Sequence, residues 1–347
     1  MKTITIEEAF KKNNKIFVDV RSPLEFEEDH ITGAINIPIL DNEERAIIGT
    51  IYKQEGKENA VQRGLDFVSP KLKKLHFEFS KLAEKYEQII IYCFRGGMRS
   101  GSVTDFIQSC GIDVLKLDGG YKSYRHFVMR YLSELQNKFT FVVLHGHTCI
   151  GKTEMLLELE KQNIGILDLE FFAKNSGSVF GDIFYKGKRP SQKFFETQLF
   201  NKLCQLELLN KKYIFMESES KKIGRCTLSK EFWQMMQNGK HILVTASMES
   251  RVRRSVSDYT LKSEDNDERL IESIQHLKDK LGKEKVGQLT EWVSAKRYED
   301  VAGFLMSEYY DKLYLHSQDQ YRYEFSVCSD DMAQSVQEIQ KWYKELE

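Results

Sequence analysis

One segment limits the possible folds of this chain more than any other. An apolar run at 139–146, FTFVVLHG, leads into GHTCIGKT at 146–153 and then into an amphipathic stretch. This is G-x-x-x-x-G-K-T between a predicted strand and a predicted helix, a context in which backbone amides cradle phosphate oxygens. Lys152 would neutralise an outer phosphate, and Thr153 could ligate Mg²⁺. The predicted phosphate-binding residues are Gly146, Cys149, Ile150, Gly151, Lys152 and Thr153.

Short apolar runs alternate with longer amphipathic stretches along much of the chain. Apolar runs without polar alternation suit strands that are covered on both faces, so the pattern predicts α/β architecture with parallel sheets. After about residue 255 the strand signals nearly vanish and helical spacing takes over. The other runs are KIFVDV at 15–20, QIIIYC at 88–93, GILDLE at 165–170, YIFMES at 213–218 and HILVTA at 241–246.

A charged, helical stretch at 121–138 separates the first group of strands from the run that begins at 139. We therefore place a domain boundary at about residue 135, and the chain of 347 residues is long enough for two domains. The prediction is one α/β domain over 1–135 and a second parallel-sheet domain over 136–347, which ends in a helical C-terminal region.

The charge balance excludes a general nucleic-acid-binding surface. Lys and Arg total 51 and Asp and Glu total 52, so the formal net charge of −1 gives no overall basic field, and RNA contacts must come from local patches. The six cysteines are widely spaced, the nearest two being Cys93 and Cys110, which indicates neither a metal knuckle nor a disulfide framework. No segment resembles a signal peptide or a membrane span. We expect a cytoplasmic protein without a metal cluster of Cys and His.

Cys93 is the best nucleophile candidate in the sequence. The segment IIIYCFRGGMRS predicts a buried strand that ends at Cys93, a loop with Gly96 and Gly97, and a helix that starts near residue 100. A thiolate there faces the amides of the turn and the positive end of the helix, and Arg95 and Arg99 add positive charge. The other cysteines lack such surroundings, so we interpret them as inert.

The segment FVDVRSPLEFEEDHITGAINIP at 17–38, followed by the cysteine loop, resembles a rhodanese domain. The resemblance implies that the cysteine carries sulfur or selenium, and that a set of flanking residues is structural. These are Asp19, Arg21, His30, Gly33 and Ala34.

The spacing Cys-x5-Arg, from Cys93 to Arg99, is one residue longer than in ordinary sulfur-transferring rhodaneses and suits a tetrahedral anion. Rhodanese-fold phosphatases share it, so a phosphatase is an alternative. However, the loop residues offer no carboxylic acid to protonate a leaving group. They are Phe94, Arg95, Gly96, Gly97 and Met98.

Two features near the phosphate loop have open interpretations. The carboxylates Asp168, Glu170, Glu217 and Glu219 follow apolar runs, where they would position metal or water, or else cap helices and pair with nearby bases. A group of phenylalanines beyond them suggests core packing, or alternatively an apolar groove of the kind that a prenyl diphosphate needs. They are Phe171, Phe172, Phe180, Phe184, Phe194 and Phe195.

A rhodanese-like domain joined to a phosphate-loop domain resembles the tRNA 2-selenouridine synthase family, nearly end to end. The matching pieces include ERAIIGTIYKQEG at 44–56, CFRGGMRS at 93–100, LDGGYKSYR at 117–125, ESESKKIG at 217–224 and YYDKLY at 309–314. The chain departs from the family at Cys149 and Ile150, where small residues are common.

For that family the resemblance implies a reaction on wobble 2-thiouridine in tRNA. Geranyl diphosphate first prenylates the sulfur, and selenophosphate then replaces the S-geranyl group with selenium. The phosphate loop would hold the diphosphate, and the Cys93 loop would handle selenophosphate, supplied by a selenophosphate-producing enzyme. No tightly bound cofactor is implied, although Mg²⁺ is compatible with the loop. The tRNA-contact candidates are Lys186, Lys188, Arg189, Lys221, Lys222, Arg225, Arg251, Arg253 and Arg254.

Two other functions are compatible with the motifs. One is a P-loop kinase or ATPase with a sulfurtransferase domain, which would turn over ATP without tRNA. The other is a phosphatase-like module that uses Cys-x5-Arg, which would hydrolyse an aryl phosphate in a reaction that depends on Cys93.

Overall fold

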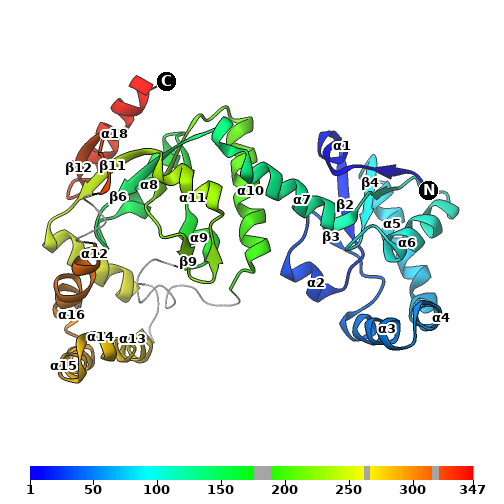
Figure 1. The fold of residues 1–347 in the computed structure, drawn as a ribbon, viewed down its shortest axis with the longest axis horizontal. Helices are drawn as coiled ribbons and strands as arrows, with labels where there is room; N and C mark the ends of the chain where they lie inside the picture. The colour runs from blue at the N-terminus through cyan, green and yellow to red at the C-terminus, as the bar shows by residue number, and fades with distance from the viewer. Residues whose placement is uncertain (176–188, 262–265, 315–319, 347) are drawn as a thin grey trace. The chain divides into compact units, whose positions relative to one another are not determined.

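The computed structural model describes residues 1–175, 189–261, 266–314 and 320–346 (Figure 1). It divides into two compact units, Met1–Leu132 with Ser191–Asn201, and Ser133–Pro190 with Lys202–Glu347. The helix α10 (Gln192–Leu208) therefore contributes its first half to the first unit and its second half to the other. The predicted domain boundary at about residue 135 does not account for Ser191–Asn201, where the chain returns to the first unit.

The first unit contains a parallel sheet of five strands in the order β1-β5-β4-β2-β3. Its strands are β1 (Thr3–Ile4), β2 (Lys15–Asp19), β3 (Ile35–Asn36), β4 (Gln88–Tyr92) and β5 (Leu115–Leu117). Its helices are α1 (Ile6–Lys11), α2 (Pro23–Glu28), α3 (Asn42–Gln54), α4 (Lys57–Val68), η1 (Ser69–Lys71), α5 (Leu72–Ala83), α6 (Met98–Ser109) and α7 (Gly120–Ser133).

Both faces of this sheet are covered, which explains the unbroken apolar runs of β2 and β4. Ile89 and Ile91 pack in one core with Phe79 of α5 and Val103 of α6. Alternate strand residues point to the opposite face. There the ring of Phe17 contacts Phe10 of α1, at 5.8 Å between ring centroids. The carboxyl end of β4 is thus held between two packed layers, directly before Cys93.

The second unit contains a parallel sheet in the order β12-β11-β6-β8-β7. Its strands are β6 (Thr140–His145), β7 (Gly165–Leu167), β8 (Tyr213–Glu217), β11 (Lys240–Thr245) and β12 (Phe325–Cys328). The strand β6 is central, and the chain turns to opposite sides of it for β7–β8 and for β11–β12. The carboxyl edge at such a switch point is where open α/β sheets bind ligands.

Helices cover this second sheet, and others form the helical C-terminal region. They are η2 (Leu135–Asn137), α8 (Lys152–Lys161), α9 (Leu169–Ala173), α11 (Lys230–Gln237), α12 (Met248–Leu261), α13 (Asn266–Gln275), α14 (Lys278–Leu281), α15 (Lys283–Ser294), α16 (Tyr298–Leu305), the π-helix η3 (Met306–Tyr310), α17 (Asp311–Tyr314) and α18 (Met332–Leu346). A small antiparallel pair, β9 (Lys222–Ile223) and β10 (Cys226–Thr227), completes the unit.

The C-terminal region is helical as predicted, with one exception. The strand β12 pairs in parallel with β11 at the edge of the sheet. Its sequence, FSVC, is short and only Val327 is buried in it, so it lacks the long apolar run that identified the other strands. The segment between β11 and β12 forms its own hydrophobic core, which includes Leu270, Leu289, Val301 and Leu305.

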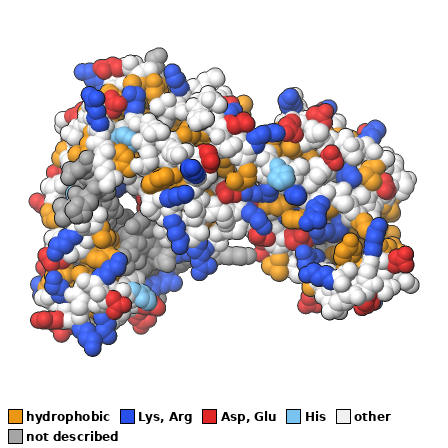
Figure 2. All heavy atoms as spheres, in the orientation of Figure 1, with side chains coloured by type: hydrophobic (Ala, Val, Ile, Leu, Met, Phe, Trp, Pro, Cys, Tyr) orange, Lys and Arg blue, Asp and Glu red, His pale blue; other side chains and the backbone are white. Residues whose placement is uncertain are grey.

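The surface agrees with the balanced composition. Figure 2 shows Lys and Arg side chains interspersed with Asp and Glu over the visible face. Among the helices that the structure describes, none has the length and apolar character needed to cross a membrane.

Candidate functional site

The first candidate site is the loop between β4 and α6, which surrounds Cys93. The cysteine is 3% exposed, whereas Phe94 and Met98 on the loop are 37% and 50% exposed. Gly96 has a φ of 63°, a conformation that glycine adopts without strain. A buried sulfur therefore lies within a loop whose other side chains are accessible.

Ser100 contacts the sulfur directly. Its hydroxyl oxygen lies 3.1 Å from Cys93 Sγ, and its side chain is fully buried in the first turn of α6. The same hydroxyl lies 3.3 Å from the carbonyl oxygen of Gly97. A hydroxyl can donate to a thiolate, so Ser100 can stabilise the charged form of Cys93. Ser100 was not predicted as a site residue, although it directly follows Arg99 in CFRGGMRS.

The segment after β5 fixes the backbone of the Cys93 loop. The amides of Tyr121 and Lys122 donate to the carbonyls of Cys93 and Phe94, at 2.8 and 2.9 Å. Gly120, with a φ of 60°, lies so close that an added Cβ would be 2.3 Å from the Cys93 carbonyl oxygen and 2.5 Å from the Gly96 nitrogen. Gly120 therefore has a structural role in the site that sequence reasoning missed. The adjacent glycines of LDGGYKSYR were the available signal.

Arg99 is held by a carboxylate that was also missed. Its two terminal nitrogens donate to Glu25 of α2, at 2.6 and 3.2 Å, in a bidentate ion pair. Burial is the largest single influence and would raise the pKa of Glu25, but the hydrogen bonds and charge of Arg99, together with Ser22 and Arg45, hold that pKa below its usual range. Glu25 also lies in the capping box of α2, where it accepts from Ser22. Arg95, by contrast, is exposed.

The second candidate site is the phosphate loop between β6 and α8. Gly151, with a φ of 85°, precedes the helix, and Cys149 also has a positive φ of 63°. A Cβ on Gly146 would lie 2.1 Å from the Ile150 side chain and 2.3 Å from a carbonyl oxygen of β11. The Lys152 ammonium donates to the carbonyls of Gly146 and His147, each at 3.2 Å. The predicted lysine thus lies against the loop itself.

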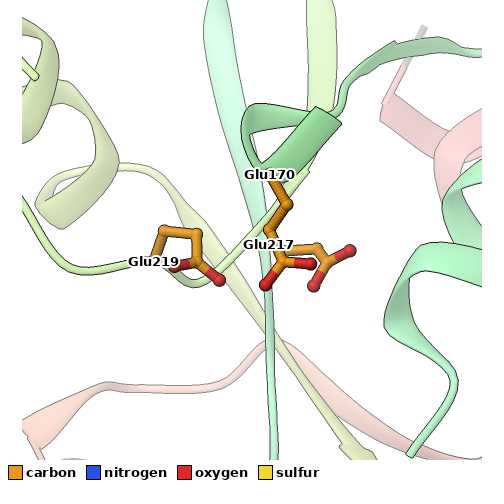
Figure 3. A group of neighbouring side chains, drawn as sticks. All are labelled: Glu170, Glu217 and Glu219. Atoms are coloured by element: carbon orange, nitrogen blue, oxygen red, sulfur yellow. The ribbon is translucent and has the colours of Figure 1, made fainter. Parts of the chain in front are cut away.

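Three glutamates meet beside this loop, as Figure 3 shows. Glu170 of α9, Glu217 at the end of β8 and Glu219 after it have carboxylate oxygens within 4.8 Å of one another. The hydroxyl of Thr153 donates to Glu217 at 2.6 Å. Burial, together with the neighbouring carboxylates, raises the pKa values of Glu217 and Glu219 to about 7. Carboxylate and hydroxyl oxygens beside a predicted phosphate-binding loop suit a hard cation such as Mg²⁺.

The fourth predicted carboxylate has a different role. Asp168 is the N-cap of α9, where its side chain accepts from the amide of Phe171 at 2.8 Å. Burial raises its pKa. Helix capping, one of the two interpretations left open, therefore accounts for Asp168, whereas the three glutamates form a cluster.

Asp311 supports the phosphate loop from the helical region. Its carboxylate accepts from both terminal nitrogens of Arg251, at 2.9 and 2.6 Å, and lies 3.0 Å from His147 Nδ1. Arg251 Nε in turn donates to the carbonyl of Thr148 at 3.1 Å. Burial is the largest single influence and would raise the pKa of Asp311, but the hydrogen bonds and charge of Arg251, together with His147, hold that pKa below its usual range. Asp311 lies in the segment YYDKLY, and its contact with the phosphate loop was not predicted.

The predicted tRNA-contact residues fall into distinct groups. Arg251 is 4% exposed and its guanidinium is engaged inside the protein, which corrects its prediction as a surface contact. Arg254 is partly buried against Ser329, and Arg189 is partly buried and donates to the carbonyl of Lys174. The exposed candidates are Lys221, Lys222, Arg225 and Arg253. Lys186 and Lys188 lie outside the described residues.

The phenylalanines do not form one described group. Phe171 is exposed on α9, and Phe195 is fully buried on α10 in the first unit. Phe180 and Phe184 lie outside the described residues. An apolar groove made by this stretch therefore remains a prediction, whereas core packing accounts for Phe195.

Comparisons with known proteins match both units. A family model described as the tRNA 2-selenouridine synthase AAA domain matches residues 139–346, and a rhodanese-like domain model matches residues 5–126. The tRNA 2-selenouridine synthase of Pseudomonas syringae pv. syringae is 31% identical over 334 residues, covering 88% of this chain and 89% of the relative. That of Shewanella denitrificans is 34% identical over 271 residues, covering 78% and 71%.

A solved structure, the N-terminal domain of a putative ATP/GTP binding protein from Clostridium difficile 630, is 52% identical and covers 37% of this chain and 99% of that chain, with a TM-score of 0.37. The family model over most of the second unit and relatives over nearly the whole length lead to one conclusion. The chain belongs to the tRNA 2-selenouridine synthase family, whose members are enzymes.

Proposed function

We propose that this protein converts wobble 2-thiouridine of tRNA to 2-selenouridine, by S-geranylation with geranyl diphosphate and then selenium transfer from selenophosphate. The observation that carries the proposal is that one chain holds two glycine-bearing loops, each at the carboxyl end of a central parallel strand, which we infer to bind anions. One contains the buried pair of Cys93 and Ser100, and the other contains Lys152 and Thr153. The family membership supplies the tRNA substrate.

The phosphate loop suits the prenylation step. The thiocarbonyl sulfur attacks the first carbon of the geranyl chain, the carbon–oxygen bond breaks, and its electron pair leaves with pyrophosphate. The loop amides and Lys152 would bind the developing charge of that leaving group. Thr153, Glu217 and their neighbours would hold Mg²⁺, which would neutralise further phosphate charge. Lys152 is the residue on which this step depends most.

The Cys93 loop suits the second step. An S-alkyl centre on the base is more electrophilic than a neutral thiocarbonyl and releases a thiol, so geranylation prepares the carbon for attack by selenium. The loop would bind the tetrahedral selenophosphate through backbone amides and Arg99, beside Cys93. The selenium would attack the base carbon, the carbon–sulfur bond would break with loss of geranyl thiol, and water would then cleave the selenium–phosphorus bond and release phosphate. The proposal requires a selenophosphate-producing enzyme upstream and places the protein in the cytoplasm with its tRNA.

Mass spectrometry of nucleosides tests the proposal. Purified protein, tRNA with 2-thiouridine and geranyl diphosphate should yield S-geranyl-2-thiouridine, and added selenophosphate should yield 2-selenouridine. We expect Lys152→Ala to stop prenylation and Cys93→Ser to stop selenation while much of the prenylation remains. Selenation that survives Cys93→Ser would show that the Cys93 loop is wrongly assigned. Binding of tRNA should also weaken at high salt, because it relies on local basic patches.

A P-loop ATPase remains the second candidate, because one observation favours it. Glu217 ends the strand next to β6 and accepts a hydrogen bond from Thr153. A carboxylate in this place holds Mg²⁺ with the loop hydroxyl in P-loop nucleotide hydrolases. ATP hydrolysis without tRNA, abolished by Lys152→Ala, would favour this candidate over prenyl transfer.

A further inference from the structure

The Cys93 loop carries an exposed aromatic side chain that the binding of an anion does not explain. Phe94 is 37% exposed, whereas Cys93 is 3% exposed. Arg95 is also exposed, as is Lys122, whose amide donates to the Phe94 carbonyl at 2.9 Å. In the proposed selenium transfer, backbone amides and Arg99 bind the anion, which leaves the Phe94 ring without a role.

The ring of Phe94 rests on a fixed support. Its centroid lies 6.0 Å from that of Tyr121, which is 2% exposed. The hydroxyl of Tyr121 donates to Asp29 at 2.7 Å, and the Arg21 guanidinium lies 4.1 Å from the centre of the Tyr121 ring. Because the support is held from two directions, Phe94 is already in place at the surface before a ligand binds.

The charged groups beside this ring are cations. The Arg95 guanidinium lies 5.8 Å from the centre of the Phe94 ring. Arg99 is paired with Glu25, but among the described residues no carboxylate pairs with Arg95 or Lys122. An exposed aromatic ring beside cations is the combination that binds single-stranded RNA, because a base stacks on the ring and phosphates bind the cations.

We propose that Phe94 stacks on the base of the tRNA nucleotide that is modified, and that Arg95 and Lys122 bind the phosphates that flank it. The inference rests on the proposed selenium transfer and adds residues that would position its RNA substrate. In that transfer the base carbon must approach an anion bound beside Cys93, and Phe94 is the next residue along the chain. The predicted tRNA-contact residues all lie between 186 and 254, so this contact in the first unit is additional to them.

A tryptophan in place of Phe94 tests stacking directly in the full-length protein. The first unit has no tryptophan of its own, since those of the chain are Trp233, Trp292 and Trp342. An anticodon stem-loop RNA with 2-thiouridine at the wobble position should quench the fluorescence of Phe94→Trp more than that of the wild type. Phe77→Trp is the matched control, because Phe77 is 56% exposed and has the Lys81 ammonium 4.1 Å from its ring centre. Equal quenching in the two variants would overturn the inference.

Affinities for the same RNA separate base stacking from other roles of the ring. Phe94→Ala should weaken binding roughly tenfold, Phe94→Tyr should restore most of that loss, and Phe77→Ala should change nothing. The loss should be equal for RNA with 2-thiouridine and with S-geranyl-2-thiouridine, and a loss confined to the geranylated RNA would overturn stacking. Inorganic phosphate should still protect Cys93 of Phe94→Ala from iodoacetamide. Loss of that protection would make Phe94 a structural residue of the loop and would also overturn the inference.

The two cations have a readout of their own. Removal of one phosphate contact lowers the slope of log affinity against log salt by about one. We expect this decrease in Arg95→Ala and in Lys122→Ala but not in Lys81→Ala, and an unchanged slope in the first two would overturn the phosphate contacts.

Mass spectrometry of nucleosides separates this inference from the proposed function. If Phe94→Ala binds the stem-loop and forms 2-selenouridine as the wild type does, the inference falls and the proposed function stands. If quenching and affinities are as expected but the wild type forms no modified nucleoside, the proposed reaction falls and the RNA contact stands.

Discussion

The two loops that we propose to bind anions are built on the same plan and supported by different means. Each follows the central strand region of a parallel sheet and precedes a helix. The Cys93 loop is supported mainly by backbone, through the amides of Tyr121 and Lys122 and the close approach of Gly120. The phosphate loop has a close backbone approach too, at Gly146, and is supported in addition by charged side chains, through Arg251 and Asp311. The first should therefore be sensitive mainly to steric change and the second to charge as well.

The largest effect should follow from steric change at the Cys93 loop. Gly120→Ala places a Cβ 2.3 Å from the Cys93 carbonyl oxygen, where only backbone movement can relieve the clash. We expect a loss of about 4 kcal/mol in the free energy of unfolding. We also expect faster alkylation of Cys93, because the displaced loop would uncover its sulfur. Urea denaturation and mass spectrometry of the Cys93 peptide measure both.

Gly111→Ala is the matched control. Gly111 also has a positive φ, but an added Cβ would meet nothing within 4 Å, so backbone strain alone should cost about 1 kcal/mol. Equal losses in the two variants would contradict the view that close approach supports the loop.

At the phosphate loop, the buried glutamates should make stability depend on pH. The pKa of Glu217 is raised from 4.5 to about 7, so the folded protein binds a proton between these values that the unfolded chain releases. The free energy of unfolding should therefore fall as pH rises from about 4.5 to about 7, by about 3 kcal/mol for this group. Glu217→Gln should reduce that slope and leave the contribution of Glu219, whose pKa is also raised to about 7. A slope that is the same in the variant and the wild type would remove Glu217 as its cause.

Charge removal at Asp311 should weaken the phosphate loop. Asp311→Asn leaves the Arg251 charge buried and without its carboxylate, at a cost of about 2 kcal/mol in stability because Asp311 is partly exposed. Pyrophosphate affinity should fall roughly tenfold as His147 and Thr148 lose support. Asp300→Asn, which breaks the exposed pair with Arg297, should change stability by less than about 0.5 kcal/mol. Unchanged pyrophosphate affinity in Asp311→Asn would mean that the phosphate loop keeps its conformation without Asp311.

The smallest effect should come from the ion pair of Arg99 with Glu25 at the Cys93 loop. Glu25→Gln removes the charge that orients Arg99, so inorganic phosphate should protect Cys93 from iodoacetamide about tenfold less well, a change of about 1.4 kcal/mol. Glu28→Gln, on the same helix but paired with Lys193, is the control and should leave protection unchanged. Stronger protection in Glu25→Gln would show that Glu25 competes with the anion for Arg99.

Much of the fold was predictable, because strands buried on both faces carry apolar runs that no other local structure explains as well. The strand β12 was missed because an edge strand of four residues carries no such run. In the sites, Cys93, Lys152 and Thr153 were predictable from motif context. Gly120 and Asp311 were not assigned, because their roles depend on contacts with segments distant in the sequence.

The amino-acid sequence by itself determined two parallel-sheet regions, the position of a cysteine loop and a phosphate loop at the ends of strands, and the family to which the motifs point. These properties follow from hydrophobic periodicity and from local loop chemistry. Only the tertiary structure decided that Arg251 supports the phosphate loop from within, that Glu25 holds Arg99, and that Phe94 is exposed beside the buried Tyr121. The reason is that the partner of a buried charge, and the exposure of a ring, are chosen by packing between segments rather than by neighbours along the chain.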